Sequence, residues 1–177
     1  IFSSLSKNLG VSGSTLVIAQ KNILNKQKQY NLPIPFDWNS FRDYNNPKIT
    51  PSFMSIYMTG INLERMIKNG GMKYYHTMNL KKSKLIYDFI DKSGYYKNNI
   101  PIQNRSRTNI TFIVNNSPEL SKEFTNQAKA TGFIGTNHHR HATEKGCRIS
   151  LYNGLDIEEL QKFIDFMKQF QKFNWPN

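Results

Sequence analysis

Cysteine, acidic residues and long apolar runs are all scarce in this chain of 177 residues. The single cysteine excludes a disulfide scaffold and a zinc module built on four cysteines. No apolar run approaches the ~20 residues that a membrane-spanning helix needs, so we expect no membrane span. The chain shows no secretory or Arg-rich amphipathic leader, and it begins at Ile1 without an initiator methionine. We therefore expect a piece of a longer protein, cytoplasmic in location, with the mitochondrion as the alternative.

Positive charge is abundant by contrast. Lys and Arg number 24 against 12 for Asp and Glu, which makes a basic protein with a net charge of +12. Such an excess is typical of a surface that binds nucleic acid or of a site for an anionic substrate. A solvated, lysine-rich exterior is the alternative. Lys81, Lys82 and Lys84 favour that alternative, because they fall largely outside the apolar face of a predicted helix.

Strands separated by helices predict an α/β layer domain from about residue 50 to 175, preceded by a fragment of a second domain. Aromatic residues make up 13% of the chain, enough to build a core. The predicted strands are a buried strand at 14–20 and shorter ones at 110–114, 133–134 and 147–152. The predicted helices are 50–70, 74–91, 117–132 and 156–173. The polar, proline-containing stretch 22–48 is typical of a surface excursion or linker.

The predicted helices carry start signals. Thr50 followed by Pro51 suits an N-cap and a first helical position, and Ser117 followed by Pro118 repeats the pattern. Asp156 caps the last helix, with Glu159 as its capping-box partner. The first helix has one regular face, because its residues Phe53, Ile56, Gly60, Leu63 and Ile67 recur at spacings of three and four.

A lysine stands in a glycine-bearing turn just ahead of the first predicted strand, in Ser6-Lys7-Asn8-Leu9-Gly10-Val11-Ser12-Gly13. The backbone of such a turn holds the lysine in place. A lysine held in this way can form an imine with an aldehyde cofactor and later shuttle a proton. An ordinary surface lysine in a turn is the alternative interpretation of Lys7.

Motifs along the whole chain resemble the C-terminal half of phosphoserine aminotransferase, a class V, fold-type I pyridoxal-phosphate aminotransferase. Lys7-Asn8-Leu9-Gly10 resembles the cofactor-lysine segment of that family, and Arg148-Ile149-Ser150-Leu151-Tyr152-Asn153 resembles its Arg-Ala-Ser-Leu-Tyr-Asn. Further segments match in order and spacing, at 51–71, 82–96, 104–110 and 163–170. The resemblance implies the end of the large cofactor-binding domain plus a linker over 1–47, and an α/β (α+β) small C-terminal domain over 48–177.

By the same resemblance, Lys7 is the catalytic residue that forms the internal aldimine with pyridoxal 5′-phosphate and moves the proton between substrate and cofactor. Arg148 matches the arginine that grips the substrate α-carboxylate, a task for which a planar guanidinium is suited. The implied reaction transfers an amino group between glutamate and 3-phosphohydroxypyruvate, a phosphorylated 2-oxo acid, in serine biosynthesis. The family forms homodimers with sites shared across the interface.

Two motifs depart from the family pattern. The family has Asn-Thr-Pro-Pro where this chain has Pro47-Lys48-Ile49-Thr50-Pro51, at the place that holds the neighbouring subunit's cofactor phosphate. Aligned without a gap, Lys48 replaces the asparagine and can supply charge to the phosphate. With a one-residue deletion, Thr50 keeps the hydroxyl of the family threonine. Ile49 offers no donor in either alignment.

The family's His-Arg pair, which helps bind the substrate phosphate, has two possible counterparts. An ungapped alignment gives His141 followed by Ala142, and a two-residue insertion gives His139 followed by Arg140. The spacing of these histidines and Cys147 fits no common zinc pattern, so we expect no metal site.

The preceding half of the family enzymes supplies the aromatic ring that stacks on the cofactor, the aspartate that pairs with its ring nitrogen and most of its phosphate ligands. We expect this N-terminal half to come from the same chain or from another one. Two alternative functions stay open. The positive charge favours a degenerate aminotransferase fold retained as a structural subunit of a larger, mitochondrial or RNA-containing, assembly. Ala142 favours a class V aminotransferase that acts on a non-phosphorylated substrate.

Overall fold

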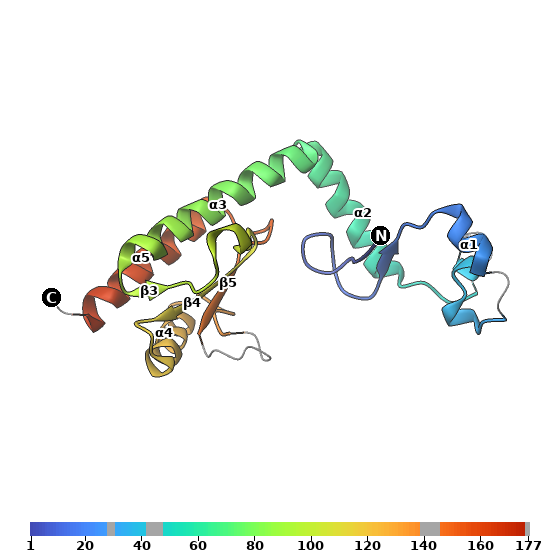
Figure 1. The fold of residues 1–177 in the computed structure, drawn as a ribbon. Helices are drawn as coiled ribbons and strands as arrows, with labels where there is room; N and C mark the ends of the chain where they lie inside the picture. Colours follow the sequence, from blue (N-terminus) through green and yellow to red (C-terminus); the bar gives the residue numbers. More distant parts are fainter. Residues whose placement is uncertain (28–30, 42–47, 139–145, 176–177) are drawn as a thin grey trace. The chain divides into compact units, whose positions relative to one another are not determined.

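The computed structural model describes residues 1–27, 31–41, 48–138 and 146–175 (Figure 1). They form two compact units, Ile1–Asn69 (unit 1) and Gly70–Asn177 (unit 2). Helices and strands occur in both units, as the predicted α/β class requires. The division at residues 47 and 48 follows from the family resemblance and stays a prediction.

Unit 1 begins with a two-stranded antiparallel ribbon. Strand β1 (Phe2–Ser4) pairs with β2 (Thr15–Val17), and both strands are exposed along their length. The prediction of a buried strand at 14–20 is therefore wrong about its burial within this chain, because β2 belongs to a two-stranded ribbon whose strands are both exposed. The stretch 22–48 is also more regular than predicted. It carries α1 (Lys21–Gln27), η1 (Ile34–Phe36) and η2 (Trp38–Phe41).

Helix α2 (Phe53–Lys68) completes unit 1. Ser52 occupies its N-cap position, so the predicted start at Thr50 is two residues early. The helix ends, as predicted, ahead of Gly70 and Gly71, whose φ angles of 104° and 61° lie in the left-handed region.

The apolar face of α2 is exposed within unit 1. Phe53, Ile56 and Ile67 are 51–74% exposed, whereas the buried residues of the helix are Ser55 and Thr59. The reason is that α2 packs a polar face against the loop between β1 and β2, whose backbone carbonyls need donors.

Unit 2 packs three helices against an antiparallel sheet of order β3-β4-β5 (Figure 1). The strands are β3 (Tyr96–Lys97), β4 (Asn109–Val114) and β5 (Cys147–Ser150), and a short turn of helix, η3 (Ile102–Asn104), precedes β4. The helices are α3 (Gly71–Ser93), α4 (Pro118–Ala130) and α5 (Ile157–Asn174). The predicted strand at 133–134 is wrong, because these residues lie in turns before a single bridge between Asn137 and Cys147.

Aromatic rings fill the core of unit 2. Phe124 of α4 is fully buried and meets Phe112 of β4 edge-on, with ring centroids 5.6 Å apart. Phe163 and Phe170 of α5 contact the same ring. Such edge-to-face pairs add to the stabilisation by apolar burial. They join α4, α5 and β4 into one packed layer.

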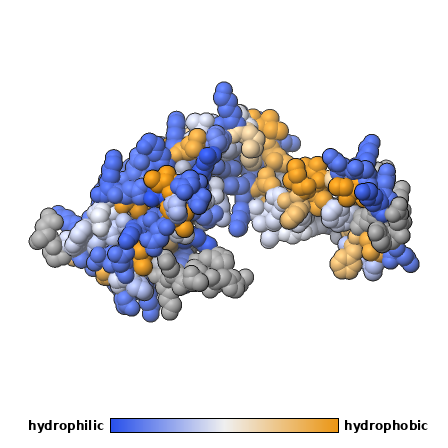
Figure 2. Space-filling view, viewed as in Figure 1, coloured by the Kyte–Doolittle hydropathy of each residue, from blue (hydrophilic) through white to orange (hydrophobic). Residues whose placement is uncertain are grey.

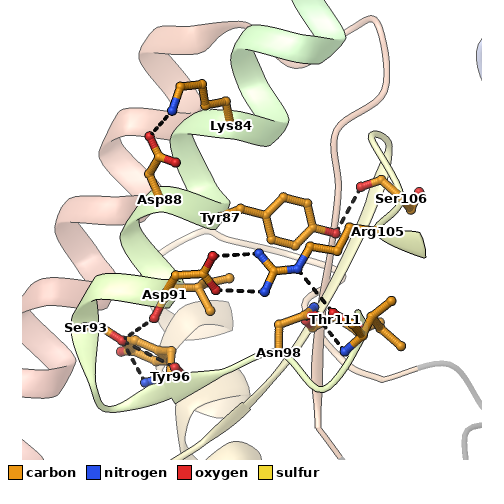
Figure 3. Close-up of polar contacts among 12 residues, drawn as sticks. Lys84, Tyr87, Asp88, Asp91, Ser93, Tyr96, Asn98, Arg105, Ser106 and Thr111 are labelled. Carbon is orange, nitrogen blue, oxygen red and sulfur yellow. Dashed lines mark hydrogen bonds and ion pairs between the residues drawn. The ribbon is translucent and has the colours of Figure 1, made fainter. Parts of the chain in front are cut away.

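Arg105 ties the segment before β4 to α3 (Figure 3). Its guanidinium donates two hydrogen bonds to the Asp91 carboxylate, at 2.6 Å and 2.9 Å, and lies 4.7 Å from the ring centroid of Tyr87. The Tyr87 hydroxyl donates to the carbonyl of Ser106 at 3.0 Å (Figure 3). The hydrogen bond with Asp91 raises the pKa of Arg105. We call Tyr87, Asp91, Arg105 and Ser106 the Arg105 clamp.

One predicted surface lysine lies in the core instead. Lys82 is 2% exposed, and its ammonium group donates hydrogen bonds to the carbonyls of Leu151, Tyr152 and Leu155 at 2.9–3.1 Å. The prediction of an outer-face position for Lys82 is wrong, because these three carbonyls of the turn after β5 accept hydrogen bonds from its buried ammonium group.

Across the described ranges, the helices are too short or too polar to cross a bilayer.

Candidate active site

Lys7 lies in the loop that joins β1 to β2. Its φ angle is 68°, a left-handed conformation that a residue with a side chain rarely adopts. A bridge between Ser6 and Gly10 closes the turn, and the Leu5 amide donates to the Ser14 carbonyl at 3.0 Å where the loop leaves the strands. The Lys7 side chain is exposed. An accessible amine on a constrained backbone fits a lysine that binds an aldehyde cofactor.

Lys48 and Thr50 lie in the segment that leads into α2, in the same unit as Lys7. Both are exposed. Their side chains are therefore accessible to an anion such as a phosphate group. Ile49 between them is 43% exposed and has no polar side-chain atom.

Arg148 stands on β5, opposite Thr111 of β4. Its backbone amide donates to the Thr136 carbonyl at 2.9 Å, which joins β5 to the loop after α4. The Nε atom of Arg148 is buried and has no hydrogen-bond partner within 1–27, 31–41, 48–138 and 146–175. A buried guanidinium nitrogen without an acceptor is costly, so this side chain is suited to receive an anionic ligand.

Arg148 lines a pocket of about 470 Å³ within unit 2. Polar groups of Thr136, Ser150 and Glu159 share the lining with the apolar side chains of Phe133, Ile134, Leu155, Leu160 and Phe163. Glu159 already accepts a hydrogen bond from Lys162 at 2.6 Å, which offsets its negative charge. The pocket therefore combines an arginine whose Nε atom has no partner among the described residues with apolar walls, a composition that suits a small carboxylate.

The structure assigns the predicted site residues to different units. Lys7, Lys48 and Thr50 belong to unit 1, whereas Arg148 belongs to unit 2. His139, Arg140 and His141 lie outside the described residues. The part of the chain that the structure describes contains no cluster of three or more potential metal ligands.

Two features of the surroundings were not recognised in the sequence. The first is the polar face of α2 beneath the Lys7 loop. Its residues, Ser55, Thr59 and Asn62, recur at steps of four and three, a helical spacing that the apolar residues of the same segment obscure. The second is the buried Lys82. Burial lowers the pKa of Lys82, and the charge of Asp156 opposes this shift. Helical spacing carries a signal for Lys82, because it lies four residues from both Met78 and Ile86, within the apolar face, whereas Lys81 lies toward the edge of that face.

The fold is that of the C-terminal part of pyridoxal-phosphate-dependent aminotransferases. The structure superposes on phosphoserine aminotransferase from Bacillus circulans subsp. alkalophilus with a TM-score of 0.88 and 33% identity, over 97% of this chain and 47% of that one. The pyridoxal-phosphate-bound phosphoserine aminotransferase of Trichomonas vaginalis gives a TM-score of 0.85 at 25% identity, over 94% of this chain and 47% of that one. An alanine–glyoxylate aminotransferase from Nostoc sp. shares the fold alone, with 16% identity and a TM-score of 0.75.

Sequence comparison finds phosphoserine aminotransferases as relatives of this chain. The chain is 40% identical over 173 residues to the phosphoserine aminotransferase of Lysinibacillus sphaericus, covering 97% of this chain and 47% of the relative. It is 36% identical over 175 residues to that of Bacillus subtilis, covering 98% of this chain and 48% of the relative. No protein-family profile matches the chain. The chain is thus a homologue of phosphoserine aminotransferases, and it spans about half the length of the curated relatives it matches.

Proposed function

We propose that this chain is the C-terminal part of an enzyme that transfers an amino group between glutamate and 3-phosphohydroxypyruvate. The observation that carries this proposal is the likeness to phosphoserine aminotransferases over 97% of the chain, which includes the constrained Lys7 turn. When bound, pyridoxal 5′-phosphate supplies an electron sink that makes the α-hydrogen of an amino acid acidic and carries the amino group between the two half-reactions.

The residues of this chain have separate tasks in such a reaction. The Lys7 amine holds the cofactor at its aldehyde carbon and, once released, carries a proton at Nζ. The Arg148 guanidinium pairs with the substrate carboxylate, which orients the α-carbon. Lys48 and Thr50 bind a cofactor phosphate. The substrate phosphate is bound either by His139 and Arg140 or by His141.

Unit 1 supports the expectation that a further half is needed. All the buried apolar side chains of the described residues lie between Tyr75 and Phe170, in unit 2. Unit 1 instead exposes apolar residues of β1, β2 and α2, and Figure 2 shows the apolar surface along α2. A two-stranded ribbon with both faces exposed is marginally stable by itself. We therefore expect the N-terminal half, from this chain or another, to cover unit 1, and a homodimer with shared sites.

Trapping of the cofactor tests the role of Lys7. The protein, purified with the polypeptide that supplies the other half, is loaded with pyridoxal 5′-phosphate and reduced with borohydride. We expect a stable adduct on the peptide that contains Lys7. Lys7→Ala should abolish this adduct and lower turnover by at least ~1000-fold, because the amine is the group that moves the proton. Lys26→Ala, at an exposed position of α1, is the control and should retain both. An adduct confined to other lysines would refute the assignment.

Substrate choice needs its own measurement. Turnover with 3-phosphohydroxypyruvate should exceed that with hydroxypyruvate by at least ~100-fold, since a buried phosphate contact to charged groups contributes several kcal/mol. Equal turnover would instead support a class V aminotransferase for a non-phosphorylated substrate.

The structural-subunit alternative has no support among the relatives, which bear the names of enzymes. It predicts a protein that fails to take up the cofactor and that co-purifies with nucleic acid in a salt-sensitive manner.

A further inference from the structure

The inner face of α2 is polar where it meets the loop that carries Lys7. Ser55 is 1% exposed and Thr59 is 6% exposed, and Asn62 follows on the same face one turn later. Residues three and four apart share one face of a helix, so the three side chains form a single stripe. We call Ser55, Thr59 and Asn62 the α2 stripe.

The stripe donates hydrogen bonds to the backbone directly after Lys7. The Asn62 amide nitrogen donates to the carbonyls of Asn8 and Leu9, at 2.8 Å and 3.0 Å. The Ser55 hydroxyl donates to the Val11 carbonyl at 3.2 Å. Three of the four peptide carbonyls from Asn8 to Val11 are thus held by side chains of one helix.

Arg65 sets the orientation of the Asn62 amide. One of its guanidinium nitrogens donates to the Asn62 carbonyl oxygen at 3.3 Å. The amide oxygen therefore faces Arg65, and the amide nitrogen faces the loop. A carboxylate in place of this amide would present acceptors to two carbonyls.

Thr59 holds the loop by shape. A Cβ added to Gly10 would overlap the Thr59 hydroxyl and lie 3.2 Å from the Thr59 Cα, so the glycine backbone rests directly on the helix. The Thr59 hydroxyl is buried without a hydrogen-bond partner in the part of the chain that the structure describes. Thr59 therefore contributes van der Waals contact with Gly10 to the stripe.

We propose that Asn62, supported by Ser55 and Thr59, is a positioning residue that holds the Lys7 turn in its left-handed conformation. The inference rests on the proposed role of Lys7 as the amine that binds the cofactor. A left-handed conformation of a residue with a side chain persists when its surroundings hold it. Asn62 fixes two successive peptide planes next to that residue, so it determines where the amine stands and how quickly an aldehyde captures it.

The test compares variants of the protein purified with its other half. Asn62→Leu removes the donor at similar volume, and Asn62→Asp replaces it by an acceptor of nearly identical shape. Glu64→Leu, at an exposed position of the same helix, is the matched control. Two quantities are measured in each: hydrogen exchange of the amides at 8–13, and the rate at which borohydride traps pyridoxal 5′-phosphate on Lys7.

We expect Asn62→Leu to speed exchange of the loop amides and to slow trapping at Lys7, each by about tenfold. Asn62→Asp should have a larger effect than Asn62→Leu, because its carboxylate repels the two carbonyls. Loss of packing alone would not make the aspartate variant the more affected of the two. Ser55→Ala removes a single bond and should change each rate by about threefold. Glu64→Leu should match the wild type.

The outcomes separate the two proposals. If the wild type traps the cofactor on Lys7 and both Asn62 variants trap it equally fast, the positioning role is wrong and the function stands. If Asn62→Leu does not fold, an unchanged Ser55→Ala rate overturns the positioning role in its place. If the wild type traps nothing on Lys7, the proposed function is wrong, and the positioning role is wrong with it.

Discussion

At the scale of single residues, Lys82 illustrates how a buried charge is accommodated. An ammonium group has three N–H donors, and each of the three has a carbonyl acceptor in the turn between β5 and α5. Without such acceptors, burial of the charge would be prohibitive. Lys82 thereby joins α3 to the turn that includes Leu155, a residue of the Arg148 pocket.

Replacement of Lys82 should therefore destabilise unit 2. Lys82→Met keeps the apolar stem and leaves three buried carbonyls without a donor, so we expect a loss of about 3 kcal/mol in the free energy of unfolding. Lys81→Met, at the adjacent exposed position, should change it by less than ~0.5 kcal/mol. Urea unfolding followed by circular dichroism measures both. Equal stability of the two variants would contradict the structural role.

Cys147 makes the stability of unit 2 depend on pH. Its thiol is 1% exposed, and burial raises the pKa of Cys147 from 9.0 to about 12. Below pH 9 both the native and the unfolded thiol keep the proton. Between pH 9 and 12 the unfolded chain loses the proton first, so this contribution to stability is lost as the pH rises.

The expected loss from this thiol is about 1.4 kcal/mol per pH unit within that window. Comparison with Cys147→Ala isolates the contribution of the thiol, because the lysines and tyrosines titrate in both proteins. Urea unfolding at pH 8 and pH 10 should show a steeper decline for the wild type. Parallel declines would show that the native thiol titrates normally.

At the scale of secondary-structure elements, the Arg105 clamp connects α3 to the start of β4 (Figure 3). The clamp needs a planar, bidentate cation that also stacks on a ring, which lysine cannot supply. We expect Arg105→Lys to lower the free energy of unfolding by about 1 kcal/mol. The exposed Arg107 offers the control, since Arg107→Lys should be neutral. Thermal unfolding compares the two, and equal melting temperatures would contradict the bidentate contact.

Element boundaries were predictable where a local cap determines them. The Ser117 hydroxyl accepts from the Leu120 amide, and the Asp156 carboxylate accepts from the Glu159 amide, as the sequence indicates. The start of α2 was misplaced, because Ser52 holds the N-cap position without a side-chain hydrogen bond. The turn at 133–134 resembles a strand only through its two apolar residues.

At the scale of the whole molecule, the apolar core of the described residues belongs to unit 2. Unit 2 should therefore resist opening on its own, whereas unit 1, whose apolar residues are exposed, should open more readily. We expect limited proteolysis of the 177-residue chain alone to cleave first within 1–69 and to leave a resistant fragment that begins near Gly70. Mass spectrometry of the fragments tests this. A first cut within α3–α5 would contradict it.

The sequence by itself indicated the resemblance to phosphoserine aminotransferases, the α/β class, the Lys7 and Arg148 candidates and the helix caps at Ser117 and Asp156. These signals are local motifs, readable from neighbouring residues. The tertiary structure alone decided that α2 buries its polar stripe and that three carbonyls accept the hydrogen bonds of Lys82. Their partners lie far along the chain: Ser55 bonds a carbonyl 44 residues away, and Lys82 bonds one 73 residues away. A donor is buried where the folded backbone brings it an acceptor, so the position of distant carbonyls decided which polar residues could leave water.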